Sequence, residues 1–195
     1  MFDAVLFDLD GTFADTAPDL AAALNRLRAD LDLPPVPLGR LRPYTSQGVR
    51  GMLKAGLSMR PGDSLYTEFY DRFLRYYSQD ICVATTVFPG IDQLLERLES
   101  RGSPWGIITN KAQRFTLPLL DQLGYAKRAA CVVSGDSARR AKPAAPPMQL
   151  ACTLITRAPG RCLYVGDDLR DIQAGRSVGM ATVAVRYGYL GDGDP

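Results

Sequence analysis

The sequence contains no histidine, and this absence removes several common kinds of active site. A 195-residue chain without histidine has no His-based catalytic triad, no histidine metal ligand and no histidine general base. Carboxylates, lysine, cysteine or hydroxyl groups must carry any chemistry. Long apolar runs are also missing, because no stretch approaches the ~20 apolar residues of a membrane span. The N-terminus lacks a basic region before its apolar run, so we expect neither a signal peptide nor membrane association.

Cysteine is scarce, and its spacing is not that of a metal or redox site. The four cysteines are Cys82, Cys131, Cys152 and Cys162. Since none forms a Cys-x-x-Cys pair, we expect reduced thiols, a protein without disulfides and a cytoplasmic location.

Charge is almost balanced, because 23 basic and 21 acidic residues give a net charge of +2. No basic block typical of nucleic-acid binding is present, so nucleic acid is not an expected partner.

Apolar periodicity predicts an α/β core that is interrupted by helices. Residues 4–7 form a short apolar run, typical of a strand that is buried on both faces. Leucines at helical spacing then begin an all-helical stretch, where Thr16 is the expected N-cap with Asp19 three residues on. Further strands are expected at 105–109, 131–134, 162–165 and 182–185. Because helices alternate with these strands, we expect a doubly wound, Rossmann-like parallel sheet. The predicted core is 1–15 and 85–195, and the predicted helical cap is 16–84.

Polar residues follow several of the predicted strands. Asp8 and Asp10 end the first strand, Thr109 ends the second, and Asp167 ends the fourth. In open α/β sheets, ligands bind outside the carboxyl ends of the strands. Carboxylates this close repel one another unless a cation compensates them, and Mg²⁺ prefers one or two carboxylates together with substrate oxygens. The sheet edge therefore predicts a Mg²⁺–phosphate site.

Four segments at these strand ends resemble the ordered motifs of the haloacid dehalogenase (HAD) superfamily. They are Asp8-Leu9-Asp10-Gly11-Thr12, Thr109-Asn110, Lys142-Pro143 and Gly166-Asp167-Asp168-Leu169-Arg170-Asp171. The resemblance spans residues 1 to about 190 and implies a HAD core with a cap inserted after the first strand. Within the superfamily the chain is most similar to phosphoglycolate phosphatase-like enzymes. Residues 164–190 also resemble N-acetylmuramic acid 6-phosphate phosphatases.

The resemblance implies a role for each matching residue. Asp8 would be the nucleophile that forms an aspartyl-phosphate, and Asp10 would be the general acid and then the general base. Thr109 and Asn110 would bind the phosphoryl group, and Lys142 would neutralise its charge. Asp8, Asp167 and the main-chain carbonyl of Asp10 would hold Mg²⁺.

Two residues of the last motif have more modest expected roles. Asp171 would act through water or through another residue rather than as a direct metal ligand. Asp168 is expected to be the N-cap of the helix that follows.

The implied activity is that of a Mg²⁺-dependent phosphomonoesterase for a small phosphorylated metabolite, most similar to phosphoglycolate phosphatase. A phosphatase for N-acetylmuramic acid 6-phosphate or another sugar phosphate remains an alternative, as do a phosphomutase and a non-catalytic HAD binding module. Dehalogenases need no acid two residues after the nucleophile, so Asp10 argues against that activity. The expected partner is a small phosphate ester, and the sequence indicates no oligomeric state.

Residues 42–50 are the segment of the cap in which we expect substrate contacts, through Arg42, Ser46 and Arg50. An ordinary helix-capping loop is the alternative interpretation. The chain departs from the HAD pattern after Lys142-Pro143, where Ala144 stands in the place that histidine often occupies. It also ends at 193–195, where related proteins usually continue with another strand and helix. Either the chain is shortened, or one edge of its sheet is less covered.

Overall fold

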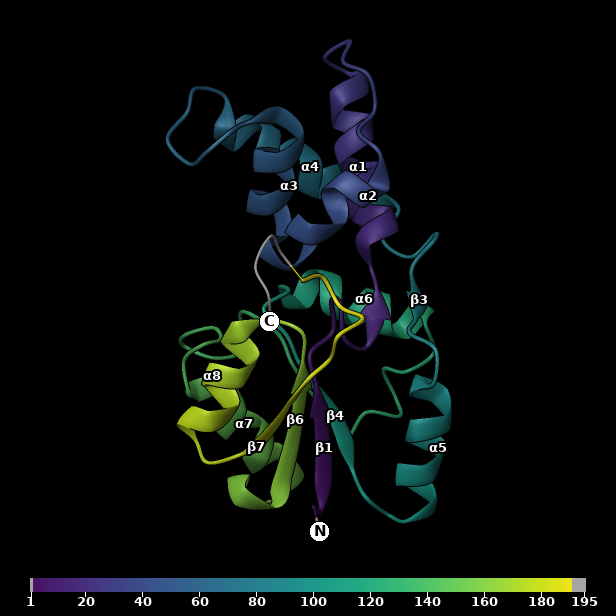
Figure 1. Ribbon diagram of the computed structural model, residues 1–195, viewed down its shortest axis with the longest axis vertical. Coiled ribbons are helices and arrows are strands. Elements are labelled where there is room, and N and C mark those ends of the chain that lie inside the picture. The colour runs from purple at the N-terminus through teal and green to yellow at the C-terminus, as the bar shows by residue number, and fades with distance from the viewer. Residues whose placement is uncertain (1, 191–195) are drawn as a thin grey trace.

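The centre of the protein is a parallel five-stranded sheet (Figure 1), seen in a computed structural model that describes residues 2–190. Its strands are β1 (Ala4–Phe7), β4 (Trp105–Ile108), β5 (Cys131–Val133), β6 (Cys162–Gly166) and β7 (Ala181–Ala184). They lie in the order β5-β4-β1-β6-β7, with β1 in the middle and parallel to both neighbours. The predicted doubly wound parallel sheet is therefore confirmed. The chain end at 193–195 lies outside the described residues.

Helices cover both faces of this sheet because successive strand residues point to opposite sides. The helices are α5 (Ile91–Ser100), α6 (Gln113–Gln122), α7 (Pro146–Ile155) and α8 (Leu169–Ser177), with a 3₁₀ turn η2 (Pro159–Arg161) before β6. On β1, Phe7 belongs to the apolar cluster that contains residues of α5 and α6. Leu6 belongs to a second cluster, formed with residues of α7 and α8. Alternation on one strand thus builds two separate hydrophobic layers.

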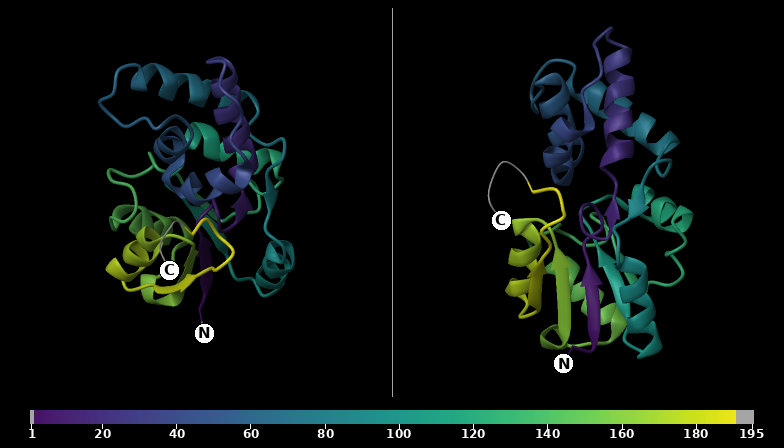
Figure 2. Two further views of the ribbon diagram at one scale, coloured as in Figure 1. Left: turned by 45° about the horizontal axis from the view of Figure 1, so that its top comes forward. Right: turned by 45° about the vertical axis from the view of Figure 1, so that its right-hand side comes forward.

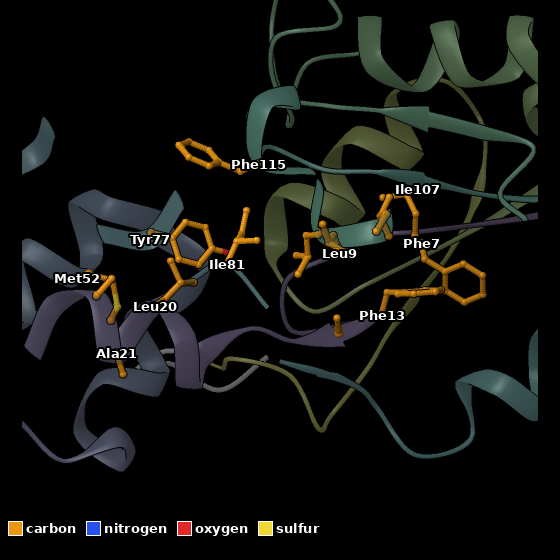
Figure 3. Close-up of a cluster of buried hydrophobic side chains, with 14 of the residues drawn as sticks. Phe7, Leu9, Phe13, Leu20, Ala21, Met52, Tyr77, Ile81, Ile107 and Phe115 are labelled. Atoms are coloured by element: carbon orange, nitrogen blue, oxygen red, sulfur yellow. The ribbon is translucent and has the colours of Figure 1, made fainter. Parts of the chain in front are cut away.

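A group of helices lies beyond the carboxyl edge of the sheet (Figures 1 and 2). It consists of α1 (Ala17–Ala29), α2 (Leu38–Leu41), the 3₁₀ helix η1 (Arg42–Gln47), α3 (Gly48–Leu57) and α4 (Tyr66–Gln79). Leu20, Leu24 and Leu27 are buried along α1 at the predicted helical spacing. One apolar cluster continues from these helices into the core. Figure 3 shows Leu20 and Tyr77 on the cap side of it and Phe115 of α6 nearby, with the Tyr77 and Phe115 rings 5.7 Å apart.

The chain passes between the core and the cap helices through a two-stranded antiparallel ribbon. It is made of β2 (Ala14–Asp15) and β3 (Thr86–Val87), with Ala14 opposite Val87. Asp19 fixes the returning segment, because its buried carboxylate accepts hydrogen bonds from the backbone N–H groups of residues 83–85. The sequence analysis did not predict this ribbon, since strands of two residues have no recognisable periodicity.

Thr16 occupies the predicted N-cap position of α1, but its side chain does not cap the helix. Thr16 does precede α1, but its φ of −93° and ψ of −4° are helical, and its side chain makes no capping hydrogen bond. N-cap side chains usually act from an extended backbone. The Thr16 hydroxyl instead donates to Asp10 Oδ1 at 2.5 Å, and the Asp19 carboxylate binds the segment before β3 rather than the start of α1. The hydrogen bond from the Thr16 hydroxyl to Asp10 therefore replaces the capping hydrogen bond that the local sequence favours.

The cysteines match the expectation of reduced thiols. Among the described residues all four are free; Cys131, Cys152 and Cys162 are buried, and Cys82 is partly buried. Burial raises the pKa of the Cys131 and Cys152 thiols to about 12, so both stay protonated near neutral pH. Within residues 2–190, no helix combines the length and apolar character needed to span a membrane.

Candidate active site

A cavity of about 280 Å³ lies where the carboxyl ends of the strands face the cap helices. Core residues that line it include Asp8, Asp10, Thr109, Asn110, Lys111 and Lys142. Cap residues that line it include Thr45, Ser46, Arg50 and Tyr77. Residues of all four predicted motifs therefore line the cavity, and the fourth motif contributes Asp168, Arg170 and Asp171.

Asp8 follows directly after β1 and is held in place through its backbone and its side chain. Its N–H donates to Val165 O at 2.8 Å, which extends the pairing of β1 with β6. Its buried carboxylate accepts a hydrogen bond from Lys142 Nζ at 2.8 Å. Burial raises the pKa of Asp8 well above its ordinary value, and the charge of Lys142 opposes that shift. The lysine is thus what favours the ionised form that a nucleophile requires.

Four oxygen atoms lie within hydrogen-bonding distance of Lys142 Nζ. Its Nζ donates to Asp8 Oδ1 at 2.8 Å, to Asp171 Oδ1 at 2.7 Å and to Ile108 O at 2.9 Å, and it also lies 2.8 Å from the Tyr164 hydroxyl. Burial disfavours the charged ammonium, but the two carboxylates outweigh burial and raise the pKa of Lys142. The ammonium therefore places a positive charge in the floor of the cavity.

Asn110, which is predicted to contact substrate, is held by two hydrogen bonds to the backbone of Lys142. Its Nδ2 donates to Lys142 O at 3.0 Å, and its Oδ1 accepts from the Lys142 N–H at 2.9 Å. Both ends of the amide are therefore already paired. Asn110 lines the cavity and its side chain contacts the backbone of Lys142, so we propose that it positions the lysine. This link joins the loop after β4 to the segment that carries the lysine.

Replacing Asn110 with Ala is expected to lower kcat by about 10- to 100-fold, because misplacement of a charged group by about 1 Å costs that much. Asn25→Ala is a matched control, since Asn25 clamps Val36 in the cap with the same two kinds of hydrogen bond. Both variants should lose similar stability, about 1–3 kcal/mol. Steady-state kinetics and thermal melting measure the two effects. Equal kcat values for the two variants would contradict the positioning role.

Asp167, which follows the end of β6, is the second buried carboxylate of the site. Its Oδ1 accepts from the Thr12 hydroxyl at 3.2 Å, and its Oδ2 accepts from the Tyr189 N–H at 2.8 Å. Gly11 allows this approach: its φ is +87°, and a Cβ there would lie 2.2 Å from Asp167 Oδ2. Burial raises the pKa of Asp167 to about 6, although the Tyr189 N–H and the Thr12 hydroxyl act in the opposite direction.

Carboxylate oxygens of Asp8, Asp167 and Asp171 all lie within 4.8 Å of one another. Asp171 is already engaged, because its Oδ1 accepts from Lys142 and its Oδ2 accepts from the Asp168 N–H at 3.1 Å. Both oxygens of Asp167 also accept hydrogen bonds, and Asp8 accepts one from Lys142 at Oδ1. The Asp168 carboxylate accepts from the Arg170 N–H at 2.8 Å, and the predicted N-cap of α8 is confirmed.

The Asp10 side chain turns away from this acidic cluster. Its Oδ1 accepts the Thr16 hydroxyl and forms an ion pair with Lys111 Nζ at 3.0 Å. The partly buried Lys111 also donates to the Tyr77 hydroxyl at 3.1 Å, which links the core to α4. Burial disfavours its charge, but Asp10 outweighs burial and raises the pKa of Lys111. The sequence places Lys111 at a strand end directly after Thr109-Asn110, but it did not predict a role for this residue.

Thr109 is buried at the end of β4 and lines the cavity. Its Oγ1 accepts the Lys111 N–H at 3.1 Å. A threonine hydroxyl also has one hydrogen to donate. The geometry therefore allows Thr109 to donate a hydrogen bond to a ligand oxygen in the cavity.

The cap residues predicted to contact substrate separate into two groups. Ser46 and Arg50 line the cavity, and the Ser46 hydroxyl donates to Asp167 Oδ2 at 3.3 Å. Arg42 is outside the cavity lining, and its guanidinium makes a two-point ion pair with Asp15 at 2.9 Å and 2.9 Å. The prediction for Arg42 is therefore corrected: a carboxylate of the β2–β3 ribbon engages it. The segment is largely the 3₁₀ helix η1 rather than a loop.

Three comparisons with known proteins agree with this geometry. The family model for haloacid dehalogenase-like hydrolases matches residues 5–185. The chain is 42% identical over 187 residues to the N-acetylmuramic acid 6-phosphate phosphatase of Pseudomonas aeruginosa, covering 96% of this chain and 83% of that protein. It is also 42% identical over 196 residues to a phosphoglycolate phosphatase of Xanthomonas campestris pv. campestris, covering 98% and 87%.

A similar fold is found among solved structures. A predicted phosphoglycolate phosphatase from Haemophilus somnus 129PT superposes with a TM-score of 0.84 at 27% identity, covering 96% of this chain and 87% of that one. The family model spans β1 to the end of β7, and the matching motifs lie at the strand ends around one cavity. The chain belongs to the haloacid dehalogenase-like hydrolases.

Proposed function

We propose that the protein hydrolyses a small phosphate monoester, with Asp8 as the nucleophile. The observation that carries this proposal is the buried Asp8 carboxylate, which is paired at one oxygen with Lys142 and lies in the same cavity as Asp10. Lys142 holds Oδ1, and Oδ2 is the oxygen available for attack. The relatives named as phosphatases support the same reaction class.

The reaction divides into two steps between these two carboxylates. In the first, an Asp8 oxygen forms a bond to phosphorus, the ester P–O bond breaks, and Asp10 gives its proton to the leaving oxygen. In the second, Asp10 takes a proton from water, which attacks the aspartyl-phosphate and releases inorganic phosphate. Lys142 and the Thr109 hydroxyl would neutralise and orient the phosphoryl oxygens throughout.

The chemistry of the acidic residues fits a hard divalent cation. Two buried carboxylates, Asp8 and Asp167, match the oxygen ligands that Mg²⁺ prefers. The main-chain carbonyl of Asp10 would complete the set that the protein supplies. A bound Mg²⁺ would neutralise charge on the phosphoryl group and on the crowded carboxylates. It would also favour the ionised form of Asp167 in an environment where burial otherwise raises the pKa of that residue to about 6.

Removal of Mg²⁺ with a chelator is expected to abolish phosphate release, and excess Ca²⁺ should inhibit, because Ca²⁺ takes more oxygen ligands and would occupy both Asp8 oxygens. Protons should compete with Mg²⁺ at Asp167, so the concentration needed for half-activation should increase as pH falls below about 6. Magnesium titrations at several pH values measure this. Full activity after exhaustive chelation would refute the metal site.

The pKa of Asp167 also determines how the stability of the metal-free protein depends on pH. The native pKa of Asp167, about 6, exceeds its ordinary value of 3.8, so native protein binds more protons than unfolded protein between these values. The metal-free protein should therefore lose stability as pH rises from about 4 to 6. Saturating Mg²⁺ should restore that stability, since it binds the ionised native form.

The cavity volume limits the substrate. About 280 Å³ is at the small end of ligand sites, which favours a small metabolite. Phosphoglycolate is our first candidate, and N-acetylmuramic acid 6-phosphate is the second, because the relatives carry these names. A panel with both compounds, other sugar phosphates and p-nitrophenyl phosphate tests the proposal. Phosphate release identifies a phosphatase, and transfer to a second sugar phosphate would identify a phosphomutase.

The domain division and the cellular location remain our proposals. We propose that residues 16–84 form the cap, which selects the leaving group, and that 1–15 and 85–195 form the catalytic core. The free thiols agree with a reducing compartment, so we propose a cytoplasmic location.

A further inference from the structure

The segment that follows β7 contacts both Asp167 and the β2–β3 ribbon at the base of the cap. It consists of Tyr187, Gly188 and Tyr189, and it lies on the yellow trace that rises from β7 toward the cap helices in Figure 1. These residues lie outside the four motifs of the sequence analysis. Tyr189 is nevertheless only 3% exposed, so this segment is packed into the protein and can fix the groups that it contacts.

The backbone of the segment lies against Asp167. The Tyr189 N–H donates to Asp167 Oδ2 at 2.8 Å. Gly188 permits this approach, since a Cβ there would lie 2.2 Å from the Asp167 Cβ and 2.7 Å from Gly11 O. A larger residue at position 188 would push the segment away from the carboxylate. The orientation of Asp167 therefore depends on how this segment is held.

The side chain of Tyr189 lies against the start of the cap. Its hydroxyl accepts from the Ala17 N–H at 2.9 Å and donates to Asp15 Oδ1 at 2.8 Å. Ala17 is the first residue of α1, and a helix cannot satisfy its first N–H groups internally. The Tyr189 hydroxyl thus provides an acceptor where Thr16 provides none. The guanidinium of Arg42, which pairs with Asp15, lies 5.7 Å from the centre of the Tyr189 ring.

Tyr187 contacts the chain where it returns from the cap. Its ring packs on Phe88, directly after β3, with ring centres 4.7 Å apart. Its hydroxyl donates to Thr12 O at 3.0 Å. Both crossings between core and cap therefore contact the same short segment, the outgoing one through Tyr189 and the returning one through Tyr187.

We propose that Tyr189 is a positioning residue that couples Asp167 to the cap, so that binding of Mg²⁺ and anchoring of the cap stabilise each other. Its N–H orients the carboxylate, and its hydroxyl holds the first turn of α1. Groups that orient a metal ligand commonly change metal affinity by about 10- to 100-fold when they are altered. Because coupling between two sites is reciprocal, a metal that fixes Asp167 also fixes the start of the cap. This inference rests on the proposed function, since it concerns the metal site assigned there.

Tyr189→Phe tests the coupling, because it keeps the ring and removes both hydrogen bonds of the hydroxyl. Calorimetric titration of the full chain with Mg²⁺ should show about tenfold weaker binding. Hydrogen exchange measured with and without saturating Mg²⁺ gives the reciprocal effect. In the wild-type protein, Mg²⁺ should slow exchange of the amides of residues 13–17 and 83–88 by the same factor of about ten. In Tyr189→Phe protein the slowing should fall below about twofold.

Tyr125→Phe is the matched control. Tyr125 is buried, its hydroxyl donates to Asp92 and the Arg128 guanidinium lies over its ring, but it is outside the cavity lining. The control should keep the wild-type affinity for Mg²⁺ and the wild-type slowing of exchange. Thermal melting shows that each variant is folded.

Gly188→Ala tests the backbone side of the same contact. Its methyl group should displace the segment from Asp167 and weaken Mg²⁺ binding by at least about tenfold. Gly39→Ala adds the same methyl group where nothing lies within 4 Å, so it should bind Mg²⁺ as the wild-type protein does.

Three results would overturn the coupling. They are equal Mg²⁺ affinities of the wild-type and Tyr189→Phe proteins, equal slowing of exchange in both, and a loss in Tyr125→Phe as large as that in Tyr189→Phe. Failure of the wild-type protein to bind Mg²⁺ would overturn the proposed metal site and this inference with it. Failure to hydrolyse p-nitrophenyl phosphate, with Mg²⁺ binding and its coupling intact, would overturn the proposed reaction alone.

Discussion

Asp8→Asn protein is expected to lose phosphate release by a factor of at least about 10⁴, the scale found when an enzyme loses its nucleophile. An amide cannot form the aspartyl-phosphate, and we expect no other residue of the cavity to replace Asp8 as the nucleophile. The fold should persist, because burial raises the pKa of the native carboxyl and a neutral amide avoids the cost of burying that charge. Phosphate release and thermal melting measure the two outcomes.

A matched control for this variant is Asp121→Asn, which changes an exposed residue of α6 outside the cavity. It should keep wild-type turnover. Mass spectrometry must exclude deamidation of the introduced amide back to aspartate. Turnover at the wild-type rate by Asp8→Asn protein verified in this way would rule out Asp8 as the nucleophile.

Lys142→Met is expected to impair both activity and stability. The substitution leaves the carboxylates of Asp8 and Asp171 buried without their common partner. Breaking a buried ion pair from one side costs about 3–5 kcal/mol. Activity should fall by about 10³-fold or more, since the cavity also loses a fixed positive charge that would face the phosphoryl group. Lys127→Met, which changes an exposed lysine, is the control and should be neutral in both assays.

A double variant separates the two effects of Lys142. Adding Asp171→Asn to Lys142→Met removes one of the two orphaned carboxylates, so part of the lost stability should return. Activity should not return, because the positive charge near Asp8 is still missing. Recovery of turnover together with stability would mean that Lys142 serves only the fold.

The strand ends were predictable from the sequence because their signals are local and redundant. A buried strand such as β1 must be apolar, so the two acids that follow it stand out. The same reasoning located Thr109 and Asp167, and parallel topology then brings all of them to one edge. The N-cap at Asp168 was also predictable, since its partner Arg170 lies two residues away.

Contacts that depend on the tertiary fold were not predictable in the same way. Arg42 pairs with Asp15, Lys111 pairs with Asp10, and Thr16 donates to Asp10 instead of capping α1. In each case a polar group could bind a local partner, solvent or a carboxylate that the fold brings close, and it binds the carboxylate. Asn110 shows the same difficulty, because its hydrogen-bonding partner is the backbone of Lys142, 32 positions later. Residue type and spacing do not determine which of several acceptors binds the donor in the folded protein.

The β2–β3 ribbon has a consequence for how this architecture can diversify. The chain leaves the core at Ala14 and Asp15 and returns at Thr86 and Val87, which are paired side by side. Exit and entry are therefore adjacent in space, which is the geometry that makes insertion into a folded protein tolerable. A cap of another length or helix order could thus be exchanged at this junction, altering the accepted leaving group while the hydrolytic residues keep their positions.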